Sequence, residues 1–318
     1  MTGKHARHRP RWIYAVVGVV AALAMSMAFF LSPAGAGTAS AATVPSQDAC
    51  HTVNNSAPVG NCGPFRQLYR DNFNPGGVVA AVPLGAFSGC AGDGDFRCSG
   101  LRAKYGHYYA TLGAYPNGWG DTANPSNHSN GNNRIFGGNY DPPTTISVLK
   151  SPSGDGIMRV HMWRAAAGGS NHVAAPVPLG CMGLRYGKFT ERFAVSARTP
   201  GYKMAHLRYT PNEVDYPEAG GNFDHDPVSE FTHGFSESGA DAAGNSAWTG
   251  YHTYSTEIVP GHIRFYFDGK LFHTVNADFP DSADWVLQNE SALAGAYAAP
   301  GSSVNIDSSW LECFSYAP

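Results

Sequence analysis

Short runs in which apolar and polar residues alternate recur along this chain, and they predict β-strands. In His262–Phe267 the apolar side chains fall at every second position, so they share one face of a strand. Asp268 and Gly269 then supply a two-residue turn, and Lys270–Val275 returns, which is the pattern of a β-hairpin. Similar patterns predict further strands at Thr145–Leu149, Gly156–Trp163, Lys188–Val195, Tyr251–Ile258 and Ser302–Ile306.

Helical periodicity is scarce, and Gly, Pro and Asn residues separate the predicted strands. Many short strands joined by such turns are typical of an all-β sandwich, and we expect a β-jelly-roll of two antiparallel sheets. No internal repeat is visible, so one domain is expected over residues 62–318, after a short N-terminal segment at 42–61. Within it, Leu84–Tyr140 has little periodicity but several aromatic residues, which favours an ordered loop that packs or binds something.

An apolar run at Trp12–Leu31 follows a leader that holds four basic residues and no acidic ones. Small residues come next, and Ala39-Ser40-Ala41 fits a cleavage signal, so residues 1–41 are expected to be a signal peptide. The run is also long enough to span a bilayer, which leaves an uncleaved signal-anchor as the alternative. We expect a secreted, extracellular protein that is soluble and monomeric after cleavage.

The charge balance argues against nucleic acid and anionic membranes as partners. The whole chain has 21 basic and 24 acidic residues, and loss of the leader leaves 17 basic residues and a net charge of −7. Polyanions attract basic surfaces, and this chain carries the opposite sign.

Six cysteines follow the signal, an even number that predicts up to three disulfides in an oxidising compartment. Their spacing favours two local loops and one long-range link, namely Cys50–Cys62, Cys90–Cys98 and Cys181–Cys313. Zinc is a poor alternative, because no C-x-x-C pair occurs.

The strongest candidate for chemistry is the segment Glu213-Val214-Asp215-Tyr216-Pro217-Glu218, which holds three carboxylates in a chain that is only 14% charged. In a regular strand Glu213 and Asp215 share a face, whereas Glu218 points the other way. A β-bulge between Asp215 and Glu218 would place all three on one face. Pro217 fits such a bulge, because it lacks the N–H that a central strand needs.

With that bulge, Glu213 and Glu218 lie effectively four strand positions apart, or about 13 Å between Cα atoms. Side chains that lean inward by roughly 4 Å each would bring the carboxyl groups to about 5 Å, the separation typical of retaining glycosidases. A solvated acidic strand or a cation-binding turn is the alternative interpretation of the same residues.

The chain around this motif resembles glycoside hydrolase family 16, whose signature in its bulged form is E-[IV]-D-x-x-E. The similarity continues, in chain order, through Tyr69–Asn74, Tyr186–Phe193, Pro200–Lys203, Tyr251–Glu257, Ile263–Gly269, Trp285–Gln288 and Val304–Asp307. These segments cover nearly the whole chain after the signal. The resemblance implies a β-jelly-roll with a concave, sugar-binding face.

The resemblance also implies a role for each acidic residue of the motif. Glu213 would be the nucleophile that forms a glycosyl-enzyme, and Glu218 would be the general acid and then the base. Asp215 would hydrogen-bond to its neighbours, and the charges of ionised Glu213 and Asp215 should raise the pKa of Glu218. His233, on the next strand, is expected to contact the sugar or the carboxylates.

Some positions depart from the family pattern. His206–Pro211 replaces a Leu-Leu-Trp-Pro-like segment, and Ile258 stands where a tryptophan is expected. These departures affect the identity of the polysaccharide substrate more than the type of reaction. The candidate substrate-binding residues are Trp119, Trp163, His233, Tyr216 and Gln288. No cofactor is expected to be required, and Asp307 is the candidate ligand for the structural calcium that some family members bind.

We therefore expect a secreted retaining endo-glycosidase that hydrolyses a β-linked polysaccharide, with β-1,3-glucan as the first candidate and a galactan as the second. A non-catalytic, lectin-like carbohydrate-binding protein is the alternative from another class, since a fold does not fix a function. A lectin, however, has no need of a crowded acidic cluster. A cell-surface structural protein held by an uncleaved signal is a third interpretation.

Overall fold

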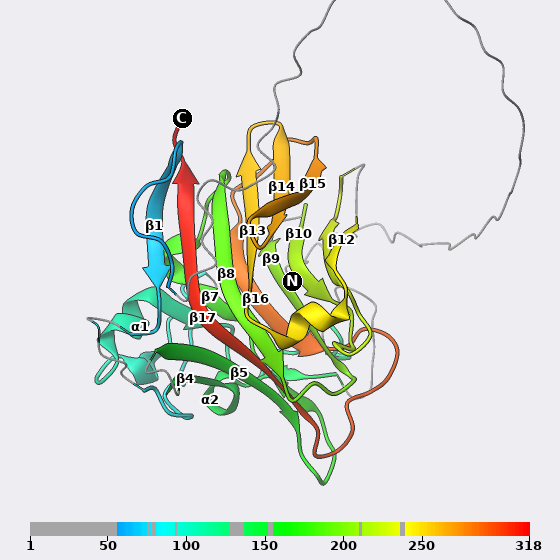
Figure 1. Cartoon of the computed structure of the whole chain (residues 1–318). Helices are drawn as coiled ribbons and strands as arrows, with labels where there is room; N and C mark the ends of the chain where they lie inside the picture. Colours follow the sequence, from blue (N-terminus) through cyan, green and yellow to red (C-terminus); the bar gives the residue numbers. More distant parts are fainter. Residues whose placement is uncertain are drawn as a thin grey trace, which may run out of the picture. The chain divides into compact units, whose positions relative to one another are not determined.

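Two β-sheets hold most of the regular structure of this chain (Figure 1). The computed structural model describes residues 56–74, 77, 81–92, 94–126, 137–151, 155–209, 212–235 and 239–318, all within one compact unit that spans residues 43–318. The predicted signal peptide at 1–41 and Cys50 lie outside the described residues. Among the helices described, none is both long and apolar enough to cross a membrane.

The larger sheet has ten strands in the order β15-β14-β13-β8-β17-β5-β6-β3, with β1 paired to β17 and β4 to β5. Its strands are β1 (Phe65–Asp71), β3 (Asn139–Tyr140), β4 (Ile146–Lys150), β5 (Gly156–Arg164), β6 (Asn171–Val173), β8 (Gly187–Ser196), β13 (His252–Val259), β14 (His262–Phe267), β15 (Lys270–Val275) and β17 (Ser303–Tyr316). All its pairs are antiparallel except β3 with β6. The predicted hairpin is confirmed as β14 and β15.

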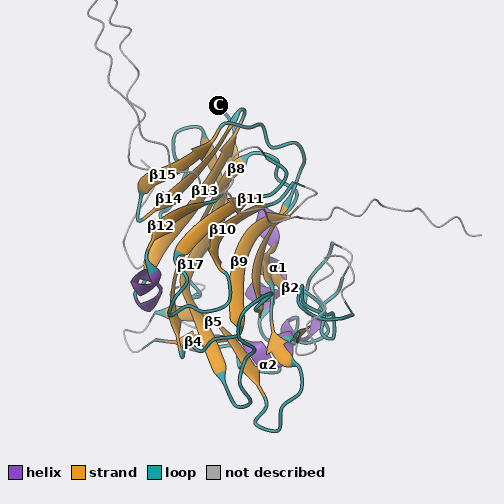
Figure 2. Cartoon of the chain, turned by 90° about the vertical axis from the view of Figure 1, so that its right-hand side faces the viewer, coloured by secondary structure: helices purple, strands orange, loops and turns teal. Residues whose placement is uncertain are grey.

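The smaller sheet has five antiparallel strands in the order β12-β11-β10-β9-β16, and Figure 2 shows several of them side by side. They are β9 (Tyr202–Tyr209), β10 (Val214–Ala219), β11 (Val228–Thr232), β12 (Ala240–Ala243) and β16 (Asp284–Ser291). A separate pair, β2 (Leu112–Ala114) with β7 (Pro176–Pro178), lies near β16, since Ala174 bridges to Asn289.

The hydrophobic core lies between the two sheets. Tyr216 of β10 meets Tyr254 of β13 and Phe265 of β14, with ring centroids 6.0 and 5.6 Å apart. Phe189 of β8 meets Trp285 of β16 at 5.7 Å. Aromatic rings at such separations bury large apolar areas and contribute beyond that burial. The arrangement confirms the expected all-β jelly-roll.

In the described part of the chain the helices are few and short: α1 (Gly106–Thr111), α2 (Pro142–Thr145), and the 3₁₀ turns η2 (Ser99–Leu101), η3 (Leu179–Cys181) and η4 (Asn245–Thr249). The described parts of the aperiodic segment Leu84–Tyr140 hold η2, α1, β2 and β3. Phe87, Tyr108 and Leu112 from this segment are buried in the core. The described parts of this segment therefore pack as part of the domain.

Two of the three predicted disulfides, Cys90–Cys98 and Cys181–Cys313, are confirmed. The pair Cys50–Cys62 remains a prediction, because Cys50 is outside the described residues. The predicted strand Ser302–Ile306 is the beginning of the longer strand β17, whose pairing with β8 shifts register between Ser308 and Trp310. That shift interrupts the alternation and hides the second half of the strand from the sequence pattern.

Candidate active site

The three carboxylates of the motif lie on or just before β10, the middle strand of the five-stranded sheet. Glu213 precedes the strand and exchanges two backbone hydrogen bonds with His233, with N–O distances of 2.8 and 3.2 Å. Asp215 lies opposite Leu207 of β9 and Phe231 of β11. These pairings fix β10 between two neighbours, so the positions of its side chains follow from the sheet register.

The predicted bulge is present between Asp215 and Glu218. Glu218 pairs with Ala205 and Ser229, so both neighbouring strands advance by two residues where β10 advances by three. The Tyr216–Pro217 peptide within this stretch is cis. Since side chains alternate along a strand, the extra residue returns Glu218 to the face that carries Glu213 and Asp215. We call this face, which points away from the ten-stranded sheet, the catalytic face.

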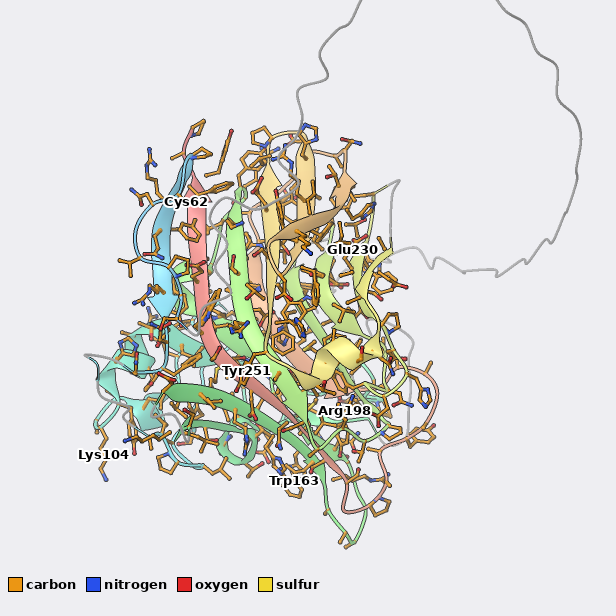
Figure 3. The ribbon with its side chains drawn as sticks, viewed as in Figure 1. Cys62, Lys104, Trp163, Arg198, Glu230 and Tyr251 are labelled. Carbon is orange, nitrogen blue, oxygen red and sulfur yellow. A yellow bond between two sulfur atoms is a disulfide. The ribbon has the colours of Figure 1, made fainter. Side chains whose placement is uncertain are left out.

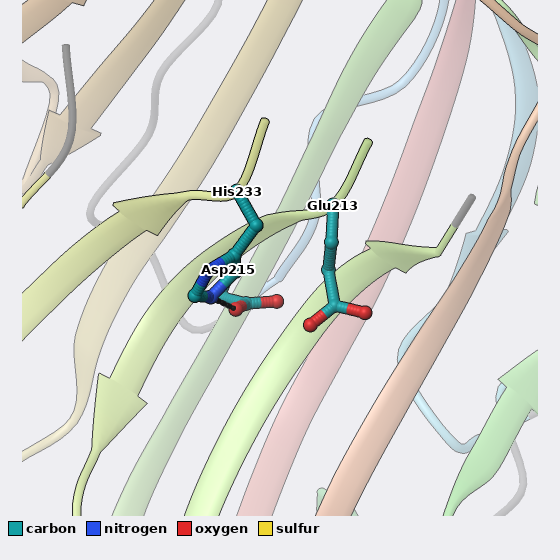
Figure 4. Close-up of side chains that lie close together, drawn as sticks. All are labelled: Glu213, Asp215 and His233. Carbon is teal, nitrogen blue, oxygen red and sulfur yellow. Dashed lines mark ion pairs between the residues drawn. The ribbon is translucent and has the colours of Figure 1, made fainter. Parts of the chain in front are cut away.

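Glu213, Asp215 and His233 form a close group on the catalytic face (Figure 4). One ligand-type atom from each lies within 4.8 Å of the others, and His233 Nε2 lies 3.0 Å from Asp215 Oδ2. The Asp215 side chain is 4% exposed and that of His233 is 58% exposed. His233 thus contacts a carboxylate, as expected. The ion pair with Asp215 holds the imidazole beside the carboxylates.

Burial dominates the proton affinities of the motif. Burial, reinforced by the charge of Asp215, raises the pKa of Glu213 to about 8 and that of Glu218 to about 7. A hydrogen bond to Asp215 raises the pKa of His233 to about 9. The raised pKa of Glu218 suits a proton donor. The raised pKa of Glu213 corrects the expectation that Glu213 is ionised at neutral pH, because desolvation penalises its charge as well.

Two other candidate residues lie on or near the catalytic face. Gln288 of β16 lies opposite Ala205, which in turn lies opposite Glu218, so all three share that face. Trp119 is 44% exposed, and its ring centroid lies 5.8 Å from that of Tyr115. The ring centroid of Tyr115 in turn lies 5.2 Å from that of Tyr140, whose hydroxyl donates a hydrogen bond to Glu290 of β16.

Two candidate substrate-binding residues lie away from the catalytic face. Tyr216 is only 3% exposed, and its hydroxyl donates a hydrogen bond to the backbone of Tyr266, because the residue after Asp215 in the strand faces the core. Trp163, labelled in Figure 3, belongs to β5 of the other sheet and stacks on His172 at 3.7 Å. It alternates with the buried Met162, so it faces away from the core on the opposite side of the sandwich.

Four residues of the catalytic face were not singled out from the sequence. Tyr209 and Phe231 are 57% and 36% exposed, on the strands that flank β10. Tyr209 precedes the motif and Phe231 follows it. Each lies at a strand position that points to the same face as the motif's carboxylates, and this alternation is the signal that could have identified them. Lys203 and Glu290 form a buried ion pair across β9 and β16. Their meeting depends on the register between two distant strands, for which the sequence carries no local signal.

Asp307 does not fit the expected calcium site. Its Oδ1 and Oδ2 accept hydrogen bonds from Nε and Nη2 of Arg159 at 2.7 and 2.8 Å. A guanidinium that binds a carboxylate through both oxygens already neutralises it, and calcium needs six to eight oxygen ligands. The pairing of β5 with β17 places Arg159 opposite Asp307, so the positive charge beside this carboxylate comes from an arginine side chain.

Removal of divalent cations is expected to leave this protein unchanged. Because Arg159 occupies the oxygens of Asp307, EDTA should shift the thermal midpoint by less than about 1 °C, and added calcium should not raise it. Differential scanning calorimetry in chelator and in millimolar calcium checks this. A midpoint that rises with calcium concentration would show that a calcium site exists.

Comparisons with known proteins agree on the fold. No protein-family profile matches the chain. A curated β-glucanase from Paenibacillus macerans is 39% identical over 46 residues, which are 14% of this chain and 19% of that protein. The matched part therefore spans less than a fifth of the length of that relative.

Solved structures match over a much greater length. A β-1,3-glucanase from Mycobacterium marinum superimposes with a TM-score of 0.53 at 18% identity, over 78% of this chain and 98% of that one. A glycoside hydrolase family protein from Mycobacterium thermorestibile gives 0.54 at 16% identity, over 78% and 100%. A glycosyl hydrolase family 16 protein from Mycobacterium smegmatis gives 0.51 at 13% identity, over 78% and 99%. This chain has the β-jelly-roll fold of the family 16 glycoside hydrolases.

Proposed function

We propose that this protein is a secreted glycoside hydrolase that cleaves β-glucan with retention of anomeric configuration. The observation that carries the proposal is the bulge in β10, which puts Glu213, Asp215 and Glu218 on one face of the sheet. The fold and the partial match to a β-glucanase support the same chemistry. Disulfides inside the domain support an oxidising, extracellular location.

In the first step, the ionised form of Glu213, which its raised pKa of about 8 makes the minor form at neutral pH, attacks the anomeric carbon of the sugar. The bond from that carbon to the glycosidic oxygen breaks, and Glu218 gives its proton to the departing oxygen. The product is a glycosyl ester on Glu213. The raised pKa of Glu218, about 7, keeps a proton available for this step near neutral pH.

In the second step, Glu218 acts as a base and takes a proton from water. The water oxygen bonds to the anomeric carbon, the ester bond to Glu213 breaks, and both carboxyl groups return to their starting forms. Asp215, held by His233 at 3.0 Å, lies beside Glu213 and accepts a hydrogen bond from it when Glu213 is protonated.

The exposed aromatic rings support cleavage within the polysaccharide chain, that is, endo-acting hydrolysis. Tyr209 and Phe231 stand on β9 and β11, on opposite sides of β10. Exposed aromatic rings beside polar groups are typical of ligand sites, and pyranose rings can stack on their faces. A glucan that crosses the strands would contact protein on both sides of the cleaved bond, as an endo-acting enzyme requires.

A panel of polysaccharides tests the proposal. The purified protein should release reducing ends from β-1,3-glucan, whereas Glu213→Gln should not, and Glu257→Gln should act as the wild type. Glu257 is a matched control, because it pairs with Arg264 at 2.7 Å on the other sheet. If the protein cleaves a galactan and no β-glucan, the substrate is a galactan and the proposed β-glucan substrate is wrong. Binding of glucan without cleavage by the folded wild type would favour the lectin-like alternative and overturn the proposal.

A further inference from the structure

A buried ion pair lies on the catalytic face one strand away from Glu218. Lys203 of β9 and Glu290 of β16 stand directly opposite each other in the sheet register. Lys203 Nζ lies 3.0 Å from Glu290 Oε2, with side chains 6% and 0% exposed. Replacing a buried ion pair by apolar residues is often neutral or stabilising, so stability alone gives no reason for these charges.

The register places the ammonium group near the predicted acid–base residue. Ala205 pairs with Glu218, and Lys203 is two residues from Ala205 on the same strand, so Lys203 and Glu218 share a face. Such diagonal neighbours lie about 7–8 Å apart, with their Cβ atoms somewhat closer, and both side chains are long enough to shorten that separation. Lys203 is therefore within electrostatic reach of Glu218.

Residues from the segment before α2 hold Glu290 in place. The Tyr140 hydroxyl donates a hydrogen bond to Glu290 Oε1, and the Thr122 hydroxyl donates another at 3.1 Å. Nearby, Asp121 accepts a hydrogen bond from the backbone N–H of Ser291 at 2.9 Å. Glu290 is thus fixed on one side by these donors and on the other by Lys203, so the pair has one defined geometry.

Charges from every strand around Glu218 act on it, and the ion pair supplies two of opposite sign. Asp215 disfavours the carboxylate form of Glu218, whereas Lys203 and His233 favour it and Glu290 disfavours it. Glu213 is the remaining titratable group of the motif, and Lys203 also favours its ionised form. The effects of Lys203 and Glu290 on Glu218 oppose each other, so removing one charge uncovers the other.

We propose that Lys203 and Glu290 are a positioning pair for the acid–base cycle of Glu218, in which Lys203 stabilises its carboxylate and Glu290 limits that effect. The proposal rests on the proposed function. Glu218 must hold a proton before the glycosidic bond breaks and must be a carboxylate once it has broken. Lys203 without Glu290 would favour the carboxylate form of Glu218 too strongly, and absence of Lys203 would favour the protonated form.

Single and double variants of the pair test this. Lys203→Met should move the limb of the kcat/KM profile that Glu218 controls up by about one pH unit, and Glu290→Gln should move it down by a similar amount. Removing both charges, in Lys203→Met with Glu290→Leu, should return the limb close to its wild-type position. Lys188→Met is the matched control, because Lys188 is fully buried on the other sheet.

A titration without substrate separates this proposal from the proposed function. Carbon-13 NMR of protein labelled at the glutamate carboxyl groups, with Glu218 assigned through Glu218→Gln, should show opposite shifts of its pKa in Lys203→Met and Glu290→Gln. That result would stand even if no polysaccharide were cleaved. Shifts of this pKa in the same direction in both variants would overturn the proposal, as would an unchanged pKa of Glu218 in folded Glu290→Gln protein. If Lys203→Met does not fold, the Glu290→Gln variant alone decides.

Discussion

Glu213→Ala and Glu218→Ala are each expected to lower kcat/KM on β-glucan by at least about 10³-fold while the domain stays folded. Without Glu213 no glycosyl ester can form. Without Glu218 the departing oxygen receives no proton, and a sugar alkoxide is a poor leaving group. Initial rates on the polysaccharide and circular dichroism of each variant check the two halves of this expectation.

Azide distinguishes the two roles, using an aryl glycoside whose leaving group needs no protonation. In Glu213→Ala, azide should attack the substrate once and give the inverted α-glycosyl azide. In Glu218→Ala, Glu213 still forms the ester, so azide should attack that intermediate and give the retained β-glycosyl azide. Glu257→Ala should give no azide product beyond the wild-type level. The same anomer from both glutamate variants would contradict the assignment of roles.

Loss of the Cys181–Cys313 disulfide is expected to have the largest effect on stability. The link joins residues 132 apart in sequence, and a loop of that length restricts the unfolded chain enough to stabilise the folded state by about 2–5 kcal/mol. Cys181→Ala with Cys313→Ala should therefore lower the thermal midpoint by roughly 5–15 °C, as measured by calorimetry. Alanine is the appropriate replacement, because both sites are fully buried.

The shorter disulfide provides the comparison. Cys90–Cys98 spans only 8 residues, so its removal should lower stability by about half as much. If removing Cys90–Cys98 lowers stability more than removing Cys181–Cys313, the entropy of loop closure is not the main source of disulfide stabilisation. The long link also matters locally, because the Cys181 carbonyl accepts a hydrogen bond from Arg208 of β9 at 3.3 Å. Alanine at position 181 keeps this carbonyl, but without the disulfide the segment that carries it is no longer tied to β17.

The features that the sequence predicted well depend on local chemistry. The β14–β15 hairpin follows from Asp268-Gly269, and the bulge follows from the parity conflict between Asp215 and Glu218 together with Pro217. Alternation also contained the signal against Tyr216, which stands next to Asp215 and therefore faces the core. Trp163 is separated from the catalytic face by topology instead, because β5 belongs to the ten-stranded sheet.

The features that the sequence did not predict depend on register between distant strands. Arg159 meets Asp307 only because β5 pairs with β17 as it does, and Lys203 meets Glu290 only through the pairing of β9 with β16. The raised pKa of Glu213 is also a tertiary property, because burial is its largest cause. No pattern within one strand carries such information.

The anomeric configuration of the first product is the most direct test of the central claim, that Glu213 and Glu218 on the bulged strand act by double displacement. Proton NMR during the first minutes of hydrolysis of a β-1,3-glucan oligosaccharide would record it before mutarotation. The β-anomer should appear first, as two successive inversions require. Initial appearance of the α-anomer would mean a single displacement, and the proposed roles of Glu213 and Glu218 would then be wrong.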